Sequence, residues 1–334
     1  MARRRTTLNN QDPHFRRSPF AGAMKAARST SRLGVAAVTA SILTACGGAT
    51  GVGDADRTEP GGVSQDLTKK VAADPSLVSL VPDVVKSRGS LIMVTDAEYA
   101  PNEFVDADGK TLIGWDVELG TAIARKLGLQ PQWINGRFDG IIPGLQAGKF
   151  DLGISSFSVT AEREKVVDFV TYYRAPGTAM LVKKGNPKGL AFDGDKACGI
   201  RLSASQGSIQ VDEIKKYSAA CKAHGKPGVP GDGQVYVAQN DAVLALQSDR
   251  TDAVLSDTPV AAYSAKQAND AFEIAAYNHQ DSAYGIALAK NGLAKAVQGA
   301  MRSLIADGTY RKLLDKWGQS GGAITDPTIN GMKS

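Results

Sequence analysis

Short apolar runs alternate with longer amphipathic runs along the chain from about residue 75 onward. The short runs are rich in Val, Ile and Leu, which is typical of buried strands. The longer runs carry apolar residues near helical spacing, as at Val117, Leu119, Ile123 and Leu127. This alternation predicts the α/β class, with parallel sheets flanked by helices. We expect strands at 91–94, 132–134, 151–154, 199–202, 235–237 and 253–255, and helices at 115–127, 141–145, 209–220 and 240–247.

Polar residues come just after four of these strands. They are Asp96, the pair Ser155 and Ser156, the Gln-Gly-Ser run at 206–208, and Asp257. Open parallel sheets bind ligands in the crevice outside the carboxyl ends of their strands. Four such positions, spread over both halves of the chain, favour one cleft shared by two lobes.

The N-terminal segment predicts secretion and lipid attachment. Basic residues at 25, 28 and 32 precede an apolar stretch at 33–43, which is much shorter than the roughly 20 residues that span a membrane. The Leu-Thr-Ala-Cys run ending at Cys46 resembles the bacterial lipobox, which implies a signal peptide at 1–45 and acylation of Cys46. An ordinary secretion signal with an incidental cysteine is the alternative. Met24 would begin a more ordinary signal than Met1, so the true translation start stays open.

Loss of residues 1–45 changes the electrostatic argument. They hold eight Lys/Arg and one Asp, so the net charge falls from +5 to −2 and no nucleic-acid partner is expected. Residues 46–70 begin with a Gly-rich polar stretch and are predicted to be a flexible tether. The remaining residues are enough for two lobes, and membrane attachment is expected through the lipid alone.

Two cysteines remain besides Cys46. Cys198 and Cys221 lie 23 positions apart, and an even pair in an oxidising exterior usually forms a disulfide, with two free thiols as the alternative. No CxxC occurs, and only His224 has ligand spacing to these cysteines, so no metal site is expected. No GxGxxG, Walker, HExxH or GxSxG motif is present, and we expect no cofactor.

Six segments, in their order and spacing, resemble bacterial extracellular solute-binding family 3, the type II periplasmic amino-acid-binding proteins of ABC importers. They are TDAEYAPNEFVDADGK (95–110), GWDVELGTAIARKLG (114–128), FDGIIPGLQAGKFDLGISSFSVTAEREKVVDF (138–169), QGSIQ (206–210), LSDTPVAAY (255–263) and ADGTYRKLLDKWG (306–318).

The resemblance implies two α/β lobes, each with a mostly parallel sheet, joined by hinge crossings near 183–187 and 282–286. Lobe 1 would comprise residues 71–184 and 285–334, and lobe 2 residues 185–284. The implied function is a monomeric receptor on the outer face of the cell membrane that passes a free amino acid to the permease subunits of an ABC transporter. A sensory module that presents its ligand to a receptor is an alternative.

The candidate site follows from the charges of a free amino acid. A protein that buries the carboxylate and the ammonium must pair each of them. Arg163 is the candidate for the carboxylate, because a guanidinium grips it bidentately, and Asp257 is the candidate for the ammonium. The resemblance adds Ser156, Ser158, Gly207 and Ser208 as carboxylate donors, the rings of Tyr99 and Phe138 around the ligand side chain, and Asp96 as a first-lobe carboxylate that meets a ligand cation.

Each role has a simpler alternative. Arg163 would be a solvated helix residue, Asp257 a helix N-cap and Phe138 a core residue. Ser156 and Ser158 would be turn or capping groups.

The chain departs from the family pattern at three positions. Asn102 stands where many relatives have an aromatic residue, Ile209 where they often have a hydroxyl residue, and Trp115 where Phe is usual. These changes leave the identity of the amino acid open. The enzyme alternative is a cyclohexadienyl or arogenate dehydratase of the same fold, with Glu98 or Glu103 as general acid, but we expect a binding protein and not an enzyme.

Overall fold

The computed structural model describes residues 66–331. The predicted signal peptide, Cys46 and the predicted tether up to residue 65 lie outside this range. The described residues form two five-stranded sheets and one three-stranded sheet. No helix among them has the length and apolar character that crossing a membrane requires.

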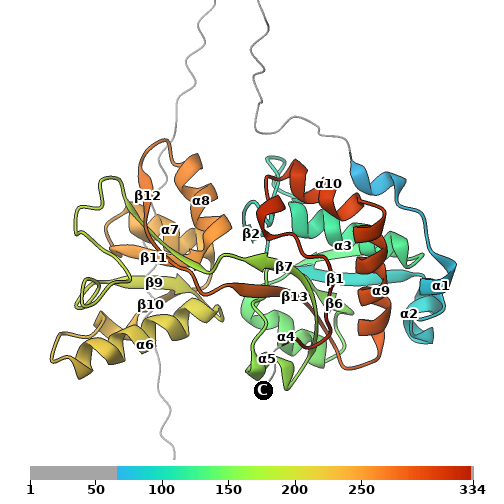
Figure 1. Cartoon of the computed structure of the whole chain (residues 1–334), viewed down its shortest axis with the longest axis horizontal. Helices are drawn as coiled ribbons and strands as arrows, with labels where there is room; N and C mark the ends of the chain where they lie inside the picture. Colours follow the sequence, from blue (N-terminus) through green and yellow to red (C-terminus); the bar gives the residue numbers. More distant parts are fainter. Residues whose placement is uncertain (1–65, 332–334) are drawn as a thin grey trace, which may run out of the picture. The chain divides into compact units, whose positions relative to one another are not determined.

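The first sheet lies at the centre of the first lobe. Its strands, in spatial order, are β5 (Gln130–Asn135), β1 (Ser90–Thr95), β6 (Leu152–Gly153), β13 (Ser282–Leu288) and β7 (Asp168–Ala175). Helices α3 (Trp115–Lys126), α9 (Leu293–Ala306) and α10 (Thr309–Lys316) pack on one face of it, and α4 (Phe138–Gln146) packs on the other (Figure 1).

The second sheet repeats this arrangement. Its strands, in spatial order, are β10 (Gln234–Tyr236), β9 (Leu202–Ser205), β11 (Ala253–Asp257), β8 (Thr178–Lys183) and β12 (Phe272–Asn278). Helix α6 (Ile209–Ala223) covers one face, and α7 (Gln239–Gln247) and α8 (Thr258–Gln267) cover the other (Figure 1).

Smaller elements complete the fold. Strands β2 (Glu98–Tyr99), β3 (Glu103–Val105) and β4 (Leu112–Ile113) form the antiparallel three-stranded sheet between β1 and α3. The short helices are η1 (Leu67–Lys70), α1 (Pro75–Val78), α2 (Asp83–Arg88), α5 (Ala161–Glu164), η2 (Pro230–Asp232) and η3 (Ser320–Gly322).

Helix α3 shows how local sequence produces the first core. Leu119 and Ile123 are buried at helical spacing, and Trp115 at the helix start is the largest fully buried side chain of the described residues. Asp116 and Glu118 in the first turn and Arg125 and Lys126 in the last turn oppose the helix dipole. The helix therefore forms where the apolar spacing predicts it. It ends at Lys126, one residue before the predicted end at Leu127.

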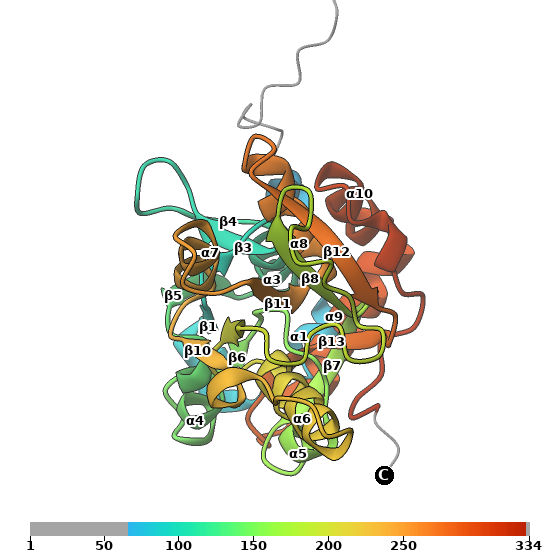
Figure 2. The ribbon, with the colours of Figure 1, turned by 90° about the vertical axis from the view of Figure 1, so that its left-hand side faces the viewer.

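The α/β class is confirmed, and each sheet is mixed, with four strands in one direction and one in the other. In each sheet three neighbouring strands are parallel, the fourth (β13 or β8) runs antiparallel to them, and the fifth (β7 or β12) pairs antiparallel with the fourth. The strands of these antiparallel pairs, β7 with β13 and β8 with β12, flank the two crossings. Strands β8 and β12 run side by side in Figure 2.

The first crossing lies earlier than the sequence suggests. It occurs at residues 176–177, because β7 belongs to the first sheet and β8 pairs with β11 and β12 in the second. This corrects the expected crossing near 183–187 and moves residues 178–184 out of lobe 1. The second crossing, at residues 279–281, precedes the expected 282–286, because all of β13 belongs to the first sheet.

Two more predictions can be compared with the structure: the C-terminal end of the tether and the disulfide. Residues 67–70 form η1 and are not tether, because Leu67 packs against the first core and the Asp66 carboxylate accepts the Thr68 N–H at 3.0 Å. Cys198 and Cys221 form the predicted disulfide, which ties the segment before β9 to α6.

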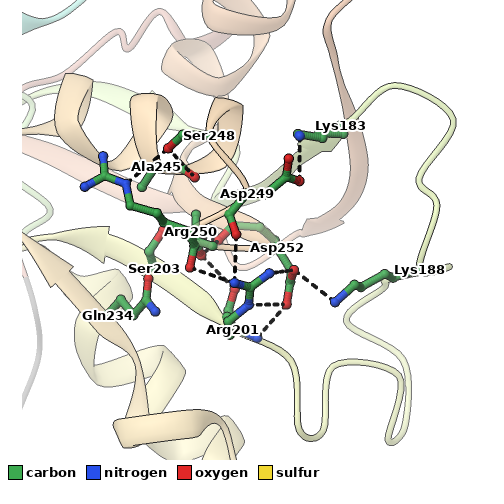
Figure 3. A network of polar contacts seen from close by, with 12 residues as sticks. Lys183, Lys188, Arg201, Ser203, Gln234, Ala245, Ser248, Asp249, Arg250 and Asp252 are labelled. Atoms are coloured by element: carbon green, nitrogen blue, oxygen red, sulfur yellow. Dashed lines mark hydrogen bonds and ion pairs between the residues drawn. The ribbon is translucent and has the colours of Figure 1, made fainter.

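A polar network around Asp252 fixes the start of β9 (Figure 3). The Asp252 carboxylate accepts the backbone N–H and the Nε–H of Arg201, both at 3.1 Å, and pairs with Lys188 Nζ at 2.9 Å. Burial raises the pKa of Asp252, but the hydrogen bonds from Arg201 and Lys188 outweigh it and lower the pKa to about 2. Because the Arg201 N–H is used in this way, the strand expected at 199–202 begins only at Leu202.

Gly177 at the first crossing should tolerate no side chain. Its φ is +86°, and a Cβ there would lie 2.1 Å from the carbonyl oxygen of Asn278 on the other crossing strand. We expect Gly177→Ala to lower the free energy of unfolding by at least about 3 kcal/mol, measured by urea denaturation. Gly185→Ala is the matched control, because its φ is +79° and nothing lies within 4 Å of the added Cβ. Equal losses in the two variants would show that the crossing strands shift easily.

Candidate ligand-binding site

One cavity lies where the carboxyl ends of strands from both sheets meet. Its lining residues are Asp96, Glu98, Tyr99, Glu103, Phe138, Ser155, Ser156, Ser158, Arg163, Ser205, Ser208, Ile209, Gln210, Gln239 and Asp257. Of the nine candidate residues from the sequence, Gly207 alone is not among them. Its carbonyl still accepts a hydrogen bond from Arg163.

Arg163 bridges the two lobes. Thr160 caps the short helix α5 by accepting the Arg163 N–H at 3.2 Å, which directs the Arg163 side chain inward. Its Nη1 donates to the carbonyl of Ser158 at 2.7 Å, and its Nη2 donates to the carbonyl of Gly207 at 2.9 Å. The guanidinium carbon also lies 5.6 Å from the ring centre of Phe138. Arg163 is therefore held in the cavity wall and is not a solvated helix residue.

Asp257 lies at the end of β11 with its carboxylate in the cavity. It occupies the N-cap position of α8, but its side chain makes no capping hydrogen bond. Instead, its two carboxylate oxygens accept from Gln210 Nε2 and from Tyr284 Oη, each at 2.7 Å. Burial raises the pKa of Asp257, and the hydrogen bonds from Tyr284 and Gln210 and the charge of Arg163 oppose this rise. The side chain thus borders the cavity and is not used as a cap.

Two aromatic side chains line the cavity from the first lobe. Phe138 stacks on Phe157 with ring centres 4.5 Å apart, so one face belongs to the core while the residue still borders the cavity. Tyr99 accepts the backbone N–H of Asp257 at 3.2 Å through its hydroxyl, which joins the two lobes. Their predicted role around a ligand side chain stays a prediction.

Ser156 has a different place from the one expected. Its backbone N–H donates to Asp116 at 2.9 Å, and its φ is +51°. Its hydroxyl lies within hydrogen-bonding distance of Asp116 and Glu103 and accepts from Asn102 Nδ2 at 2.8 Å. Ser156 lines the cavity, but these partners already use the donors that the sequence assigned to a ligand carboxylate.

Asn102 and Trp115, two of the departures from the family pattern, contact each other. Trp115 Nε1 donates to Asn102 Oδ1 at 2.7 Å, and both side chains are fully buried. A buried indole N–H needs an acceptor, which Asn102 supplies and an aromatic residue would not. The two departures therefore form one hydrogen-bonded unit that also holds Ser156.

Beneath Ser156 lies a buried pair of acids, Glu103 and Asp116. Burial raises the pKa of Glu103 well above its usual range, and the neighbouring Asp116 raises it further. Burial also raises the pKa of Asp116 to about 6, although hydrogen bonds from Tyr172, Glu103 and Ser156 lower it in part. A hydrogen bond between the two carboxyl groups requires that one of them carry a proton, and the pKa of Glu103 is raised further than that of Asp116.

Asp96 marks an acidic end of the cavity. It accepts the backbone N–H of Phe138 at 3.0 Å. Burial raises its pKa to about 6, the Phe138 N–H opposes this, and the charges of Glu98 and Asp139 raise it further. Asp96 and Glu98 thus repel each other when both are ionised, and a cation between them would relieve the repulsion.

Several lining residues were not assigned a ligand role from the sequence. Gln210 lies in the first turn of α6, close to Ser208, and Gln239 follows the end of β10 by three residues. Asp96 and Asp257 were predicted because they are polar residues that come just after a strand. The same rule would have identified Gln239. Glu98 and Glu103 entered the sequence argument only as possible general acids. No group of three or more His, Cys, Asp or Glu residues that could hold a metal occurs between residues 66 and 331.

Two α/β sheets that share one cavity at their strand ends define a type II periplasmic binding protein. The chain belongs to the bacterial extracellular solute-binding proteins, family 3, whose pattern matches residues 91–320. The family and the fold class expected from the sequence are thus confirmed.

Individual relatives agree with this assignment. Arginine-binding protein ArgT of Corynebacterium glutamicum is 28% identical over 299 residues, which are 89% of this chain and 95% of that protein. An ancestral arginine-binding protein bound to arginine has 36% identity and a TM-score of 0.62, and the match covers 69% of this chain and 98% of that one. An ancestral amino acid-binding protein, a precursor of cyclohexadienyl dehydratase, has 32% identity and a TM-score of 0.60, with coverages of 72% and 99%.

The acid pair predicts that stability declines as pH rises. Both folded-state pKa values lie above the unfolded values near 4, so the stabilisation is complete below about pH 4 and is lost as pH rises through 6 and beyond. Glu103→Gln keeps a donor toward Asp116 but cannot ionise. We expect urea unfolding at pH 5, 7 and 9 to show a shallower decline for this variant, by up to about 1.4 kcal/mol per pH unit. Asp96 is present in both wild type and Glu103→Gln, so its titration does not account for a difference between them. Glu162→Gln, which replaces an exposed carboxyl group, is the control. Parallel stability curves would contradict the shared proton.

Proposed function

We propose that this protein is an extracytoplasmic receptor that is anchored through a lipid on Cys46 and captures a free amino acid for an ABC importer. The observation that carries the proposal is the placement of two opposite charges in one buried cavity. Arg163 comes from the first lobe and Asp257 from the second. A ligand held by both charges would tie the lobes together.

The hydrogen-bonding capacity left on the two residues fits a zwitterion. Arg163 has five N–H donors, and the structure uses Nη1 and Nη2 once each, so others remain for a carboxylate. The Asp257 carboxylate has about four acceptor positions and uses two. Ser158 and Ser208 line the same cavity and add hydroxyl groups near Arg163. The α-carboxylate and the α-ammonium of one amino acid would complete both sets.

The side chain of the amino acid is proposed to be cationic. Asp96 and Glu98 line the cavity, and neither has a basic side chain as a hydrogen-bond partner among the described residues. A ligand cation would offset the repulsion that raises the pKa of Asp96. The arginine-binding relatives support this class of ligand.

Binding without turnover is the proposed activity, although one relative is named as a precursor of a dehydratase. A general acid must reach the substrate freely. Glu103 is fully buried and bonded to Ser155 and Ser156, and it shares a proton with Asp116. Glu98 accepts the backbone N–H of Asn240. These bonds favour a fixed role for Glu103 in the cavity wall, and one oxygen of Glu98 is held at the first turn of α7.

Removal of either charge should cost most of the affinity. In isothermal titration, Arg163→Ala or Asp257→Ala leaves one ligand charge unpaired in a buried site. We expect a loss of about 2–5 kcal/mol, which is thirty-fold to several thousand-fold in Kd. The amide of the preferred amino acid lacks the carboxylate, so it should bind weakly to wild type, and Arg163→Ala should reduce its affinity little further. The N-acetyl derivative lacks the ammonium, so it should also bind weakly to wild type, and Asp257→Ala should reduce its affinity little further. Arg302→Ala and Asp83→Ala, both at exposed ion pairs, are the controls. Binding within threefold of wild type in either cavity variant would refute the assignment.

The lipid anchor is tested at Cys46. Cys46→Ser removes the thiol that would be acylated, so the variant should appear in the medium or remain as uncleaved precursor. Fractionation of cells and metabolic labelling with a fatty acid measure both outcomes. Membrane retention of Cys46→Ser at the wild-type level, with no change in labelling, would contradict lipid attachment.

A further inference from the structure

Three polar atoms in the wall of the cavity have no hydrogen-bond partner among residues 66–331. They are Oε2 of Glu98 and both amide atoms of Gln239, Oε1 and Nε2. All three atoms are buried, and Gln239 is only 4% exposed. Buried polar side-chain atoms in folded proteins are paired in the large majority of cases, so three unpaired atoms in one place require an explanation.

Glu98 and Gln239 approach each other from different lobes. Glu98 lies on β2 of the first lobe, and Gln239 is the first residue of α7 in the second. Burial raises the pKa of Glu98, and a hydrogen bond from the backbone N–H of Asn240 lowers it in part. Because Asn240 directly follows Gln239, the Glu98 carboxylate lies at the first turn of α7, the helix that Gln239 begins.

The fold makes no use of the free atoms. The N-cap of α7 is Ala238, and no side chain caps this helix. The interaction of Glu98 with Asn240 leaves Oε2 without a partner. Both residues line the same cavity as Arg163 and Asp257. The unpaired atoms therefore belong to residues that border the proposed ligand cavity.

The charges divide this cavity into two ends. The acids that act on Arg163 are chiefly Asp257 and Asp212, whereas the charges that act on Asp96 are those of Glu98, Asp139 and Arg137. The main charges that act on Arg163 thus differ from those that act on Asp96. An amino acid held by its α-groups at the first end would extend its side chain to the second.

We propose that Oε2 of Glu98 and the amide of Gln239 bind the far end of the ligand side chain and select a guanidinium group. This inference rests on the proposed function. A guanidinium carries five N–H groups in one plane and serves acceptors on two different residues, whereas an ammonium presents its three N–H groups from a single atom. The negative charge of Glu98 favours the guanidinium over a neutral ureido group, although a ureido oxygen would pair with Nε2 of Gln239.

Isothermal titration of two cavity variants tests the assignment. Gln239→Met removes both amide atoms at similar length, and Glu98→Gln keeps an acceptor for Asn240 while it removes the charge. The exposed Gln247→Met, at the other end of α7, is the matched control. The ligands are L-arginine, its neutral analogue L-citrulline, L-lysine, and L-methionine as an apolar side chain of similar length.

We expect wild type to bind L-arginine at least tenfold more tightly than L-lysine or L-citrulline. Gln239→Met should weaken the binding of L-arginine by about 10- to 100-fold. The binding of L-methionine should stay the same or become tighter, because the variant has lost two unpaired polar atoms. Glu98→Gln should weaken arginine more than citrulline, and Gln247→Met should change nothing.

Three outcomes would contradict the inference without contradicting the proposed function. Arginine binding within threefold of wild type in Gln239→Met, or equal losses for arginine and methionine, would show that Gln239 does not read the side chain. Tighter binding of citrulline than of arginine by wild type would refute selection of a guanidinium. In each case the loss of binding in Arg163→Ala still supports the proposed function. If no free amino acid binds wild type, the proposed function itself fails.

Discussion

The antiparallel pairing of the strands on either side of the two crossings is the constraint on which the rest of the structure depends. Strand β7 pairs with β13 in the first sheet, and β8 pairs with β12 in the second. The chain therefore passes between the lobes twice along neighbouring paths, Ala175 opposite Ser282 on one side and Thr178 opposite Asn278 on the other. Gly177 lies between these pairs, where the backbone of the second crossing leaves no space for a side chain. This close pairing brings the carboxyl ends of both sheets to one cavity.

The bonds across the cavity come from polar atoms and not from a shared apolar core. Each of the four hydrophobic clusters lies within one lobe. The lobes meet instead through hydrogen bonds of Arg163 with the Gly207 carbonyl, of the Asp257 N–H with Tyr99, of the Asp257 carboxylate with Tyr284, and of Gln206 with Asp139. One aromatic contact, with ring centres 6.2 Å apart, joins Phe104 and Tyr263. Polar contacts of this kind exchange readily with water, so they stabilise association of the lobes only modestly. Under the proposed function, a charged ligand that pairs with residues of both lobes would add to the free energy that holds them together.

The sequence predicted much of this because its strongest signals are local. Apolar spacing located α3 and β1 to within a residue or two, and polar residues after strands identified Asp96 and Asp257. The failures involve partners distant in sequence. Arg201 looked like part of a strand, but its N–H binds Asp252, 51 residues away. The donors of Ser156 looked free, but Asp116 takes them from 40 residues earlier. The three unpaired atoms of Glu98 and Gln239 are a property of the closed arrangement of two lobes, which no local pattern contains.

The Asn102–Trp115 pair shows that two departures from a family pattern can have a single structural explanation. From the sequence, Trp115 only replaces the usual Phe, and Asn102 only replaces an aromatic residue that many relatives carry. The structure joins them, because the Asn102 amide accepts from the Trp115 indole and donates to the Ser156 hydroxyl. Ser156 in turn binds Asp116, whose carboxyl group shares a proton with Glu103 in the cavity wall. Since every member of this chain of hydrogen bonds is buried, replacement of one would leave its neighbours unpaired, at a cost of about 1–3 kcal/mol for each group. The members of the network therefore depend on one another, and so does the part of the cavity wall that they hold in place.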